Sequence, residues 1–260
     1  MKIDLNPAPL TSQQCQVLAD ALEDTPETVI SIFHLRRGLA RAYVVGNPAD
    51  FQAAVVEAEG APGEPTVFGR DVPLLADLLP AIPGWYCVNV SPDIAPALGP
   101  LLVERMGRSV RYYGDIHHTL VEPAPDIANP AVRQLALADL PLLEAAPPDI
   151  RGLDPRRLLA EMAAAGAIVD GQIVAIAINY ARSAGYADIG VHTLPEWRAR
   201  GLATAAAAIV ARHMQASGRI PVWSCGEDNQ ASLRVAQKLG FREVSRRTYI
   251  ILNDEAAEAN

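Results

Sequence analysis

The sequence contains little cysteine, few aromatic residues and no apolar run long enough to span a bilayer. Of its 260 residues 3 are cysteine, and aromatic residues make up 5%. Cys15, Cys87 and Cys225 stand far apart without a Cys-x-x-Cys pair, which argues against a disulfide framework and against a zinc site. The N-terminus lacks a basic-then-apolar leader. We therefore expect a soluble, cytoplasmic protein without a membrane partner.

Motifs and charge that would indicate nucleotide or nucleic-acid binding are also missing. Neither Gly-x-x-x-x-Gly-Lys-Ser/Thr nor a strand-linked Gly-x-Gly-x-x-Gly is present, which argues against a nucleotide enzyme. The formal net charge is −8, and residues 1–130 carry 8 Lys and Arg against 16 Asp and Glu. Phosphate contacts need clustered Lys and Arg, so we expect no nucleic-acid partner. The acidic half is compatible with a cationic acceptor, although a solubilising surface explains it more simply.

What is present indicates an α/β chain with a mixed sheet and two domains. Hydrophobic residues make up 50% of the sequence, enough for each domain to bury a core. The proline-rich stretch 122–130 predicts a stiff linker between domains at 1–121 and 131–260. Strands and helices follow one another in the same order in both halves, without a residue-level repeat.

In the first half, N-caps with helically spaced apolar residues predict helices, and β-rich runs between turn residues predict strands. The predicted helices are 11–22, 71–79 and 94–106. The predicted strands are 28–35, 40–45, 51–58, 85–90 and 109–121, and a loop is predicted at 60–69.

In the second half, Asp170-Gly171 between β-branched pairs predicts a two-residue hairpin. The second strand of this hairpin extends to Tyr180 as an apolar run, so we expect it to be buried on both faces. The further predicted strands are 132–138, 186–193, 220–225 and one that begins at Phe241. The predicted helices are 139–145, 154–165, 202–216 and one that begins at Asn229 and ends before Gly240.

The stretch Arg198-Ala199-Arg200-Gly201-Leu202-Ala203 connects a predicted strand to a predicted helix. A small-residue loop of this kind points main-chain N–H groups at one spot, and the helix adds its positive N-terminal end. Gly201 allows close approach, Ala203 keeps the first turn slim, and Arg198 and Arg200 add charge. The stretch therefore predicts a pyrophosphate site.

The second half resembles the GNAT acetyltransferases. Arg198-x-x-Gly201-x-Ala203 matches the cofactor loop of that family, and the next helix opens with Asn229 and closes on Leu239-Gly240-Phe241 as in the family. The resemblance is close over 131–252 and covers 1–121 only in outline.

The resemblance implies a GNAT fold in the C-terminal half and a degenerate GNAT-like domain in the N-terminal half. In the N-terminal half we expect the corresponding loop at 60–69. There Pro62 and Pro65 remove N–H donors and Glu64 has the wrong charge for a diphosphate, so we expect no coenzyme A in that half.

The resemblance also implies the reaction: an acetyl group passes from acetyl-CoA, a co-substrate, to a small-molecule or peptide amine by direct attack in a ternary complex, without a metal. It implies cofactor contacts by residues of the strand, the loop and the two helix starts. These residues are Val191, His192, Thr193, Arg198, Ala199, Arg200, Gly201, Leu202, Ala203, Thr204, Asn229 and Ser232. A homo-oligomer is compatible with this interpretation.

A general base is expected, because an alkylammonium ion with a pKa of about 10.4 must lose a proton before it attacks. His192 and Asp188 are the catalytic candidates, since they share one face of the predicted strand and Gly190 leaves space between them. Glu196 and Glu227 are considered after them.

No residue is assigned as the general acid. Many family members place a tyrosine acid where this sequence has Ala236, and Tyr249 is the substitute considered. A thiolate is a good leaving group, with a pKa of about 8.5, so losing this acid costs less than losing a base would. A coenzyme-A-binding regulatory module without turnover is the alternative function. Trp197 and Trp223 are candidates for an acceptor pocket, with core packing as the simpler interpretation.

Overall fold

A computed structural model describes residues 7–253 and has a mixed α/β fold. Contacts divide the chain into unit 1 (Met1–Ile116 and Ser245–Asn260) and unit 2 (His117–Val244). Strands β5 (Val110–Thr119) and β11 (Arg242–Leu252) each begin in one unit and end in the other. We call them the crossing strands. The stretch 122–130 lies inside unit 2.

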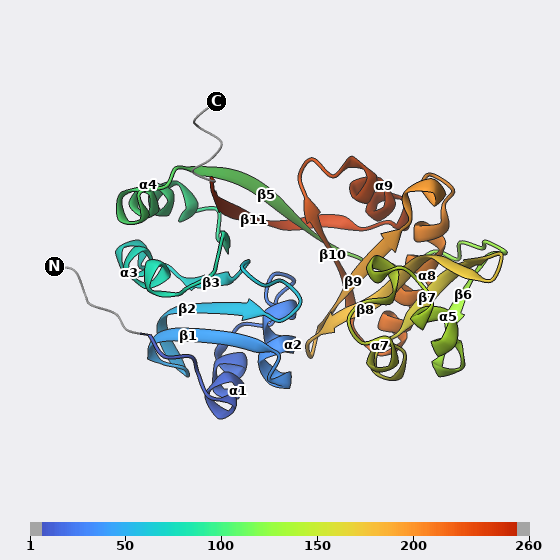
Figure 1. Cartoon of the computed structure of the whole chain (residues 1–260), viewed down its shortest axis with the longest axis horizontal. Coiled ribbons are helices and arrows are strands. Elements are labelled where there is room, and N and C mark those ends of the chain that lie inside the picture. The colour runs from blue at the N-terminus through green and yellow to red at the C-terminus, as the bar shows by residue number, and fades with distance from the viewer. Residues whose placement is uncertain (1–6, 254–260) are drawn as a thin grey trace. The chain divides into compact units, whose positions relative to one another are not determined.

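Unit 1 is a sheet in the order β1-β2-β3-β4-β11-β5 with helices on both faces (Figure 1). Its other strands are β1 (Ala40–Asn47), β2 (Asp50–Ala58), β3 (Thr66–Gly69) and β4 (Cys87–Val90). Its helices are α1 (Ser12–Ala21), α2 (Val29–Arg37), α3 (Val72–Leu78), the 3-10 turn η1 (Leu79–Ala81) and α4 (Ala95–Met106). One apolar core contains α3 and α4, and a second contains α1 and α2.

The strand predicted at 28–35 is wrong, because these residues form α2 (Val29–Arg37). Ile32 and Leu35, about one turn apart, are both buried in the core shared with α1. Gly38 adopts φ 67° and ends the helix. Burial at helical spacing therefore outweighs the β propensity of this run. The other predicted helices and strands of this half are present, with shifted boundaries.

The loop predicted at 60–69 is also partly wrong, since Thr66–Gly69 forms β3. In the order of elements, the connection that corresponds to the anion loop of the second half is the short segment 70–71 before α3. There Asp71 accepts a hydrogen bond from the Leu74 N–H (3.0 Å) and caps α3. A carboxylate stands at this helix N-terminus in place of the Arg-x-x-Gly-x-Ala pattern.

Unit 2 is a sheet in the order β6-β7-β8-β9-β10-β5. Its strands besides the crossing strands are β6 (Val132–Leu135), β7 (Ala164–Val169), β8 (Gln172–Arg182), β9 (Tyr186–Thr193) and β10 (Ile220–Gly226). Its helices are α5 (Leu140–Glu144), α6 (Pro148–Arg151), α7 (Pro155–Glu161), α8 (Leu202–Ala216) and α9 (Gln230–Leu239). The 3-10 turns are η2 (Leu137–Asp139) and η3 (Pro195–Trp197).

The helix predicted at 154–165 is shorter in the structure: α7 stops at Glu161, and Ala164 already begins β7. Ala164 pairs with Ile178 of β8, and the alanines that follow are buried. Alanine favours a helix in isolation, but small side chains here let helices pack closely on the sheet. The hairpin is confirmed: Asp170 (φ 49°) and Gly171 (φ 75°) form its two-residue turn.

Two apolar layers sandwich the sheet of unit 2. One face carries Ile189 and Val191 of β9 and packs against α8 and α9. The other face carries Ile176 of β8 and packs against α5, α6 and α7. The long predicted helix is confirmed as α8, which contains nine buried residues. Because side chains alternate along a strand, each position of β9 and β10 can be assigned to one of the two layers.

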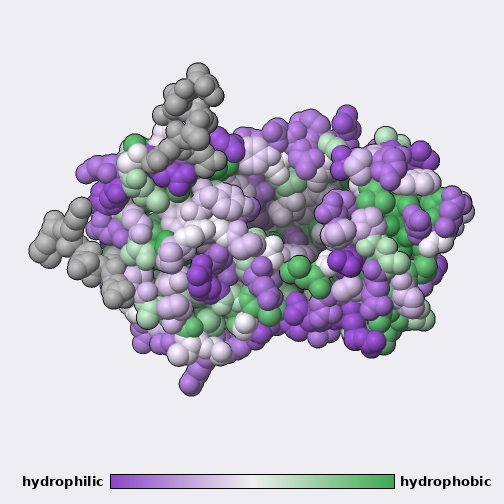
Figure 2. Space-filling view, viewed as in Figure 1, coloured by the Kyte–Doolittle hydropathy of each residue, from purple (hydrophilic) through white to green (hydrophobic). Residues whose placement is uncertain are grey.

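Hydrophilic residues cover most of the face seen in Figure 2, as expected when the apolar residues fill these cores. Within residues 7–253, no helix combines the length and apolarity needed to cross a membrane.

Candidate functional site

Strands β9 and β10 of unit 2 are parallel neighbours that separate along their length. Their pairing ends at Asp188↔Val222, whereas β9 continues to Thr193. Beyond this pair the two strands are no longer paired with each other. We call this unpaired stretch at their carboxyl ends the unit 2 cleft. In open α/β sheets, ligands bind outside the carboxyl ends of the strands.

Main-chain groups of β9 point into the unit 2 cleft. The Leu194 N–H donates to the Val174 carbonyl of β8 (3.0 Å), so alternation turns the main-chain groups of Val191 and Thr193 away from β8. In the described chain these groups have no strand partner on the β10 side. The Thr193 Oγ1 is also buried without a hydrogen-bond partner among the described residues. The cleft therefore offers polar groups to an extended ligand.

The loop after β9 has the backbone of an anion cradle. Ala199 has φ 60° and Gly201 has φ 76°, both in the left-handed region. Left-handed residues in a turn can point main-chain N–H groups toward one concavity. Both residues are exposed, and a Cβ at Gly201 would meet no atom within 4 Å, so the space beside the loop is open.

Each of the two loop arginines makes one hydrogen bond to a main-chain carbonyl. The Arg198 Nε donates to the Thr193 carbonyl (3.2 Å). The Arg200 Nη2 donates to the Glu196 carbonyl (3.2 Å), and its guanidinium lies 4.6 Å from the centroid of the half-buried Trp197 ring. A guanidinium has five donors, so most remain available for an anion.

The first turn of α8 adds to this positive site. Its N-cap is Gly201, which provides no capping side chain, and its first turn contains no acidic residue. The early N–H groups of the helix therefore face the loop uncapped. Leu202 and Thr204 are buried in the turn and Ala203 is half-buried. The structure thus brings together all the predicted residues from Val191 to Thr204 in one strand–loop–helix segment.

Asn229 and Ser232 lie at the start of α9. The Asn229 Oδ1 accepts from the Ser232 N–H (3.1 Å), as an N-cap should. The Ser232 Oγ accepts from the indole Nε1 of the buried Trp223 (2.9 Å). Trp223 is therefore a core residue and does not line a pocket. Ala236 is buried in the same core.

His192 and Asp188 lie on the face opposite α8 and α9. The side chain of His192 is 32% exposed, and its Nε2 lies 3.8 Å from the Asp149 Oδ2 of α6. Asp188 is 5% exposed. The space expected at Gly190 is not open, because a Cβ there would meet the Ile178 Cγ1 of β8 at 3.4 Å. The two candidates share a face, but a β8 side chain packs between them.

His117, which the sequence analysis did not single out, lies on this same face. Leu120 of the crossing strand segment packs in the α8 and α9 core, so the odd-numbered position His117 points to the opposite layer. That layer carries His192 and Asp188, since Val191 lies in the α8 and α9 core. His117 is 6% exposed. One signal for His117 was present in the sequence: it is a histidine near the end of the strand predicted at 109–121.

The remaining candidates lie elsewhere. Tyr249 belongs to unit 1, pairs with Asn89 of β4, and has its pKa raised by burial, so its hydroxyl holds its proton. Glu196 and Glu227 are exposed. Across residues 7–253, no three His, Cys, Asp or Glu side chains gather as a metal site.

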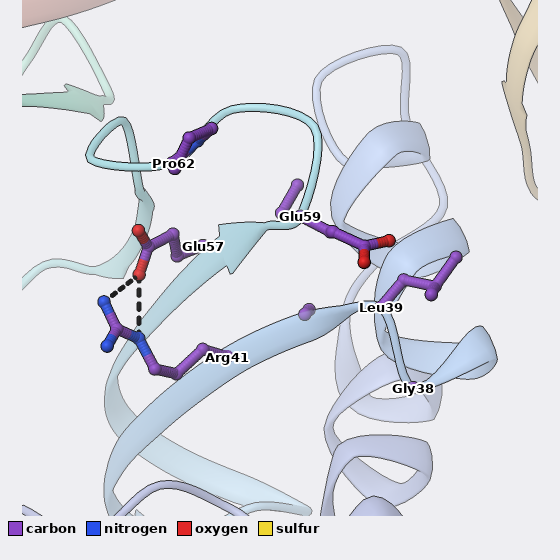
Figure 3. Close-up of a pocket in the computed structure, with 8 residues that line it drawn as sticks. Gly38, Leu39, Arg41, Glu57, Glu59 and Pro62 are labelled. Atoms are coloured by element: carbon purple, nitrogen blue, oxygen red, sulfur yellow. Dashed lines mark hydrogen bonds and ion pairs between the residues drawn. The ribbon is translucent and has the colours of Figure 1, made fainter. Parts of the chain in front are cut away.

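A surface cavity of about 320 Å³ lies in unit 1, between the start of β1 and the end of β2 (Figure 3). The Arg41 Nε and Nη2 donate to the Glu57 Oε2 at its edge (2.9 and 2.5 Å). Its lining residues include none of the predicted site residues. They are Gly38, Leu39, Ala40, Arg41, Glu57, Ala58, Glu59 and Pro62.

A parallel strand pair that splays, followed by a cradle loop and an uncapped helix, can be compared with known families. Residues 164–251 match the GNAT acetyltransferase family model. The matched range runs from β7 into β11 and contains the whole strand–loop–helix segment. No curated protein matches the sequence.

Solved GNAT structures share the fold over nearly the whole chain. A GCN5-related N-acetyltransferase-like protein from Streptococcus suis aligns with a TM-score of 0.67 at 20% identity, covering 93% of this chain and 99% of that chain. A GNAT-family acetyltransferase from Colwellia psychrerythraea aligns with a TM-score of 0.61 at 12% identity, covering 96% and 100%. A tandem GNAT protein from the clavulanic acid biosynthesis pathway aligns with a TM-score of 0.57 at 16% identity, covering 94% of this chain and 97% of that chain. At these identities the likeness shows the GNAT fold alone.

Proposed function

We propose that unit 2 binds acetyl-CoA and transfers its acetyl group to an amine. The observation that carries the proposal is the cradle loop at 198–201, which joins an open strand edge to an uncapped 15-residue helix. Two cations stand on this loop and the helix begins without an acidic residue. A diphosphate would bind at the loop and the helix start, and an amide-bearing arm attached to it would lie along the strand edge.

The residues present fit coenzyme A. The N–H groups of Gly201, Leu202 and Ala203 and the two guanidinium groups would hold the pyrophosphate. The outward main-chain groups of Val191 and Thr193 would pair with the amide-bearing arm as a strand does. Asn229 keeps its amide nitrogen for the same arm, because only its oxygen is used in the cap. The Ser232 Oγ accepts from the Trp223 indole, which leaves its hydroxyl hydrogen for the same arm.

Acetyl-CoA, when bound, supplies an activated thioester. The chain must orient the acceptor amine and remove its proton. His192 is the base we favour, since its imidazole is partly exposed on the face away from the cofactor helix and histidine is the side chain that most often serves as a general base. A proton held on its imidazole would be stabilised by Asp149, whose carboxylate lies 3.8 Å away. Asp188, deeper on the same face, is the alternative base.

A second function is tested because Ala236 itself has no hydroxyl. Ala236 is buried in the α8 and α9 core, where the family often places its acid. A unit that retains the cradle loop without that acid could bind coenzyme A as a regulatory module. Since a thiolate is a good leaving group, we favour the enzyme.

Turnover against binding separates the two functions. The full chain is incubated with acetyl-CoA and a panel of primary amines, including small amines, amino acids and peptides, and free thiol is measured over time. We expect amine-dependent thiol release that exceeds the rate without amine. Calorimetric binding of acetyl-CoA without thiol release for any amine would favour the binding module.

A further inference from the structure

Unit 1 contains a cleft built in the same way as the unit 2 cleft. Its parallel strands β3 and β4 pair only at Thr66↔Asn89 and then separate. The crossing strand β11 runs antiparallel beside β4, with Tyr249↔Asn89 and Thr248↔Val90. The cleft is therefore bounded by β3 on one side and by β4 and β11 on the other.

A buried arginine fills the unit 1 cleft. Arg247 of β11 is 8% exposed and reaches across β4. Its Nη2 donates to the main-chain carbonyls of Val67 on β3 (2.9 Å) and of Asn89 on β4 (3.0 Å). Its Nε donates to the Asn89 side-chain oxygen, and its guanidinium lies 5.5 Å from the centroid of the Phe68 ring. Carbonyls at the point of separation are thus satisfied by the chain itself.

The arginine is charged despite its burial. Desolvation lowers the pKa of Arg247 to about 10, still well above neutrality. Glu27 and then Asp115 favour the charged form. Asp115 also accepts a hydrogen bond from the amide nitrogen of Asn89 (3.4 Å). Burying a guanidinium is costly unless its donors are satisfied, so this network holds the side chain in the cleft.

The position of Arg247 has a counterpart in unit 2. There β10 leaves β9 after Val222, and the crossing strand β5 runs beside β10. The Leu120 N–H donates to the Pro221 carbonyl (3.0 Å) and the His118 Nδ1 lies 3.4 Å from the Trp223 carbonyl. This register places Thr119 opposite Val222, as Tyr249 stands opposite Asn89.

Counting two residues back along each crossing strand gives Arg247 in unit 1 and His117 in unit 2. Both side chains are buried, and both lie on the sheet face opposite the core of the two later helices. An imidazole is shorter than an arginine side chain by several atoms. His117 therefore cannot span β10 to reach the carbonyls of β9 as Arg247 spans β4.

We propose that this one position on each crossing strand decides whether a cofactor cleft is filled: Arg247 occupies the unit 1 cleft as an internal ligand, and His117 leaves the unit 2 cleft open. The inference rests on the proposed function in its first test, which measures coenzyme A binding by unit 2. Its second test, which measures melting temperature, does not depend on that function. Asp71 also disfavours a cofactor in unit 1, because its carboxylate caps the N-terminus of α3, where the phosphates of a cofactor would otherwise bind.

The first test is His117→Arg, with His117→Gln as the matched control. The arginine should fill the unit 2 cleft and weaken coenzyme A binding by about 100-fold or more in calorimetry, because its side chain would occupy the space beside β9 that the ligand needs. His117→Gln should bind within about threefold of the unchanged protein. Circular dichroism confirms that each variant is folded. A folded His117→Arg protein with unchanged affinity would overturn the proposal.

The second test does not depend on coenzyme A and also decides the matter if His117→Arg does not fold. Arg247→Ala should lower the melting temperature by several degrees, and millimolar N-methylguanidinium should restore part of this loss by occupying the vacated cleft. Arg111→Ala, an exposed arginine on β5 of unit 1, is the control and should show neither effect. Equal responses of the two variants would show that Arg247 is not an internal ligand.

Failure of the proposed function would look different. If the unchanged protein binds no coenzyme A while N-methylguanidinium still rescues Arg247→Ala selectively, the unit 1 cleft is filled as proposed and the function of unit 2 is wrong.

Discussion

Asp139 fixes the connection between β6 and the helical layer of unit 2. Its Oδ1 accepts from the Arg133 Nη2 (2.6 Å), and its Oδ2 accepts from the Arg133 Nη1 (2.9 Å) and the Ala136 N–H (2.8 Å). The hydrogen bonds from Arg133 hold the pKa of Asp139 below its ordinary value. The folded state therefore prefers the ionised carboxylate.

Asp139→Asn should lower the free energy of unfolding by about 1–3 kcal/mol at pH 7, because a charge-assisted pair and one acceptor are lost. The folded pKa lies below the unfolded one, so this contribution is complete above about pH 5 and disappears as the pH falls through the folded pKa. Urea denaturation between pH 3 and 7 measures the difference in free energy of unfolding between the unchanged protein and Asp139→Asn. A difference that stays constant down to pH 3 would contradict a lowered pKa of Asp139.

His192→Ala should reduce kcat about 100-fold, while the KM for acetyl-CoA stays within a few-fold, because main-chain groups and the loop hold the cofactor. Asp149→Asn should also lower kcat by removing the carboxylate 3.8 Å from the His192 Nε2. Steady-state kinetics between pH 6 and 9 measure both effects. Wild-type rates for His192→Ala would show that His192 is not the general base, and Asp188→Asn would then be tested.

At the scale of elements, the sequence was sufficient where local signals agree with packing. The strand 186–193, the helix 202–216 and the hairpin at 170–171 are confirmed, because turn chemistry and periodicity specify them locally. Predictions failed where burial decides: the β-branched run at 29–37 is helical, and alanines after 163 form a strand. Those choices depend on partners distant in the sequence.

The site was predicted in the same uneven way. The loop, strand and helix residues could be read from the order of residues, because they are contiguous. His117 and Arg247 could not, because their roles depend on crossing strands that leave one unit and enter the other. A register between distant strands has no local signature.

The loop glycine and a helix-ending glycine allow a matched comparison. Gly201 (φ 76°) and Gly38 (φ 67°) both adopt the left-handed region, and a Cβ at either meets no atom within 4 Å. Alanine at each should therefore cost about 1 kcal/mol of stability. Only Gly201→Ala should also weaken coenzyme A binding, because it alone alters the cradle. Equal affinity of the two variants would argue against a ligand at this loop.

For the whole molecule, two similarly ordered units differ in their capacity for a cofactor. Unit 2 has the arginines, the glycine and an uncapped helix, whereas unit 1 has Asp71 at its helix start and Arg247 in its cleft. We expect one coenzyme A per chain. Calorimetric titration gives the stoichiometry, and two equivalent sites per chain would show that unit 1 is also competent.

The most direct test of the central claim is coenzyme A binding by the variant Arg198→Ala with Gly201→Asp. The substitutions remove one cation and place a carboxylate in an exposed loop, so the fold should persist while the pyrophosphate loses its contacts and meets a like charge. Calorimetry on the folded variant should detect no binding under conditions where the unchanged protein saturates. Unchanged affinity in the folded variant would contradict the placement of the cofactor at this loop.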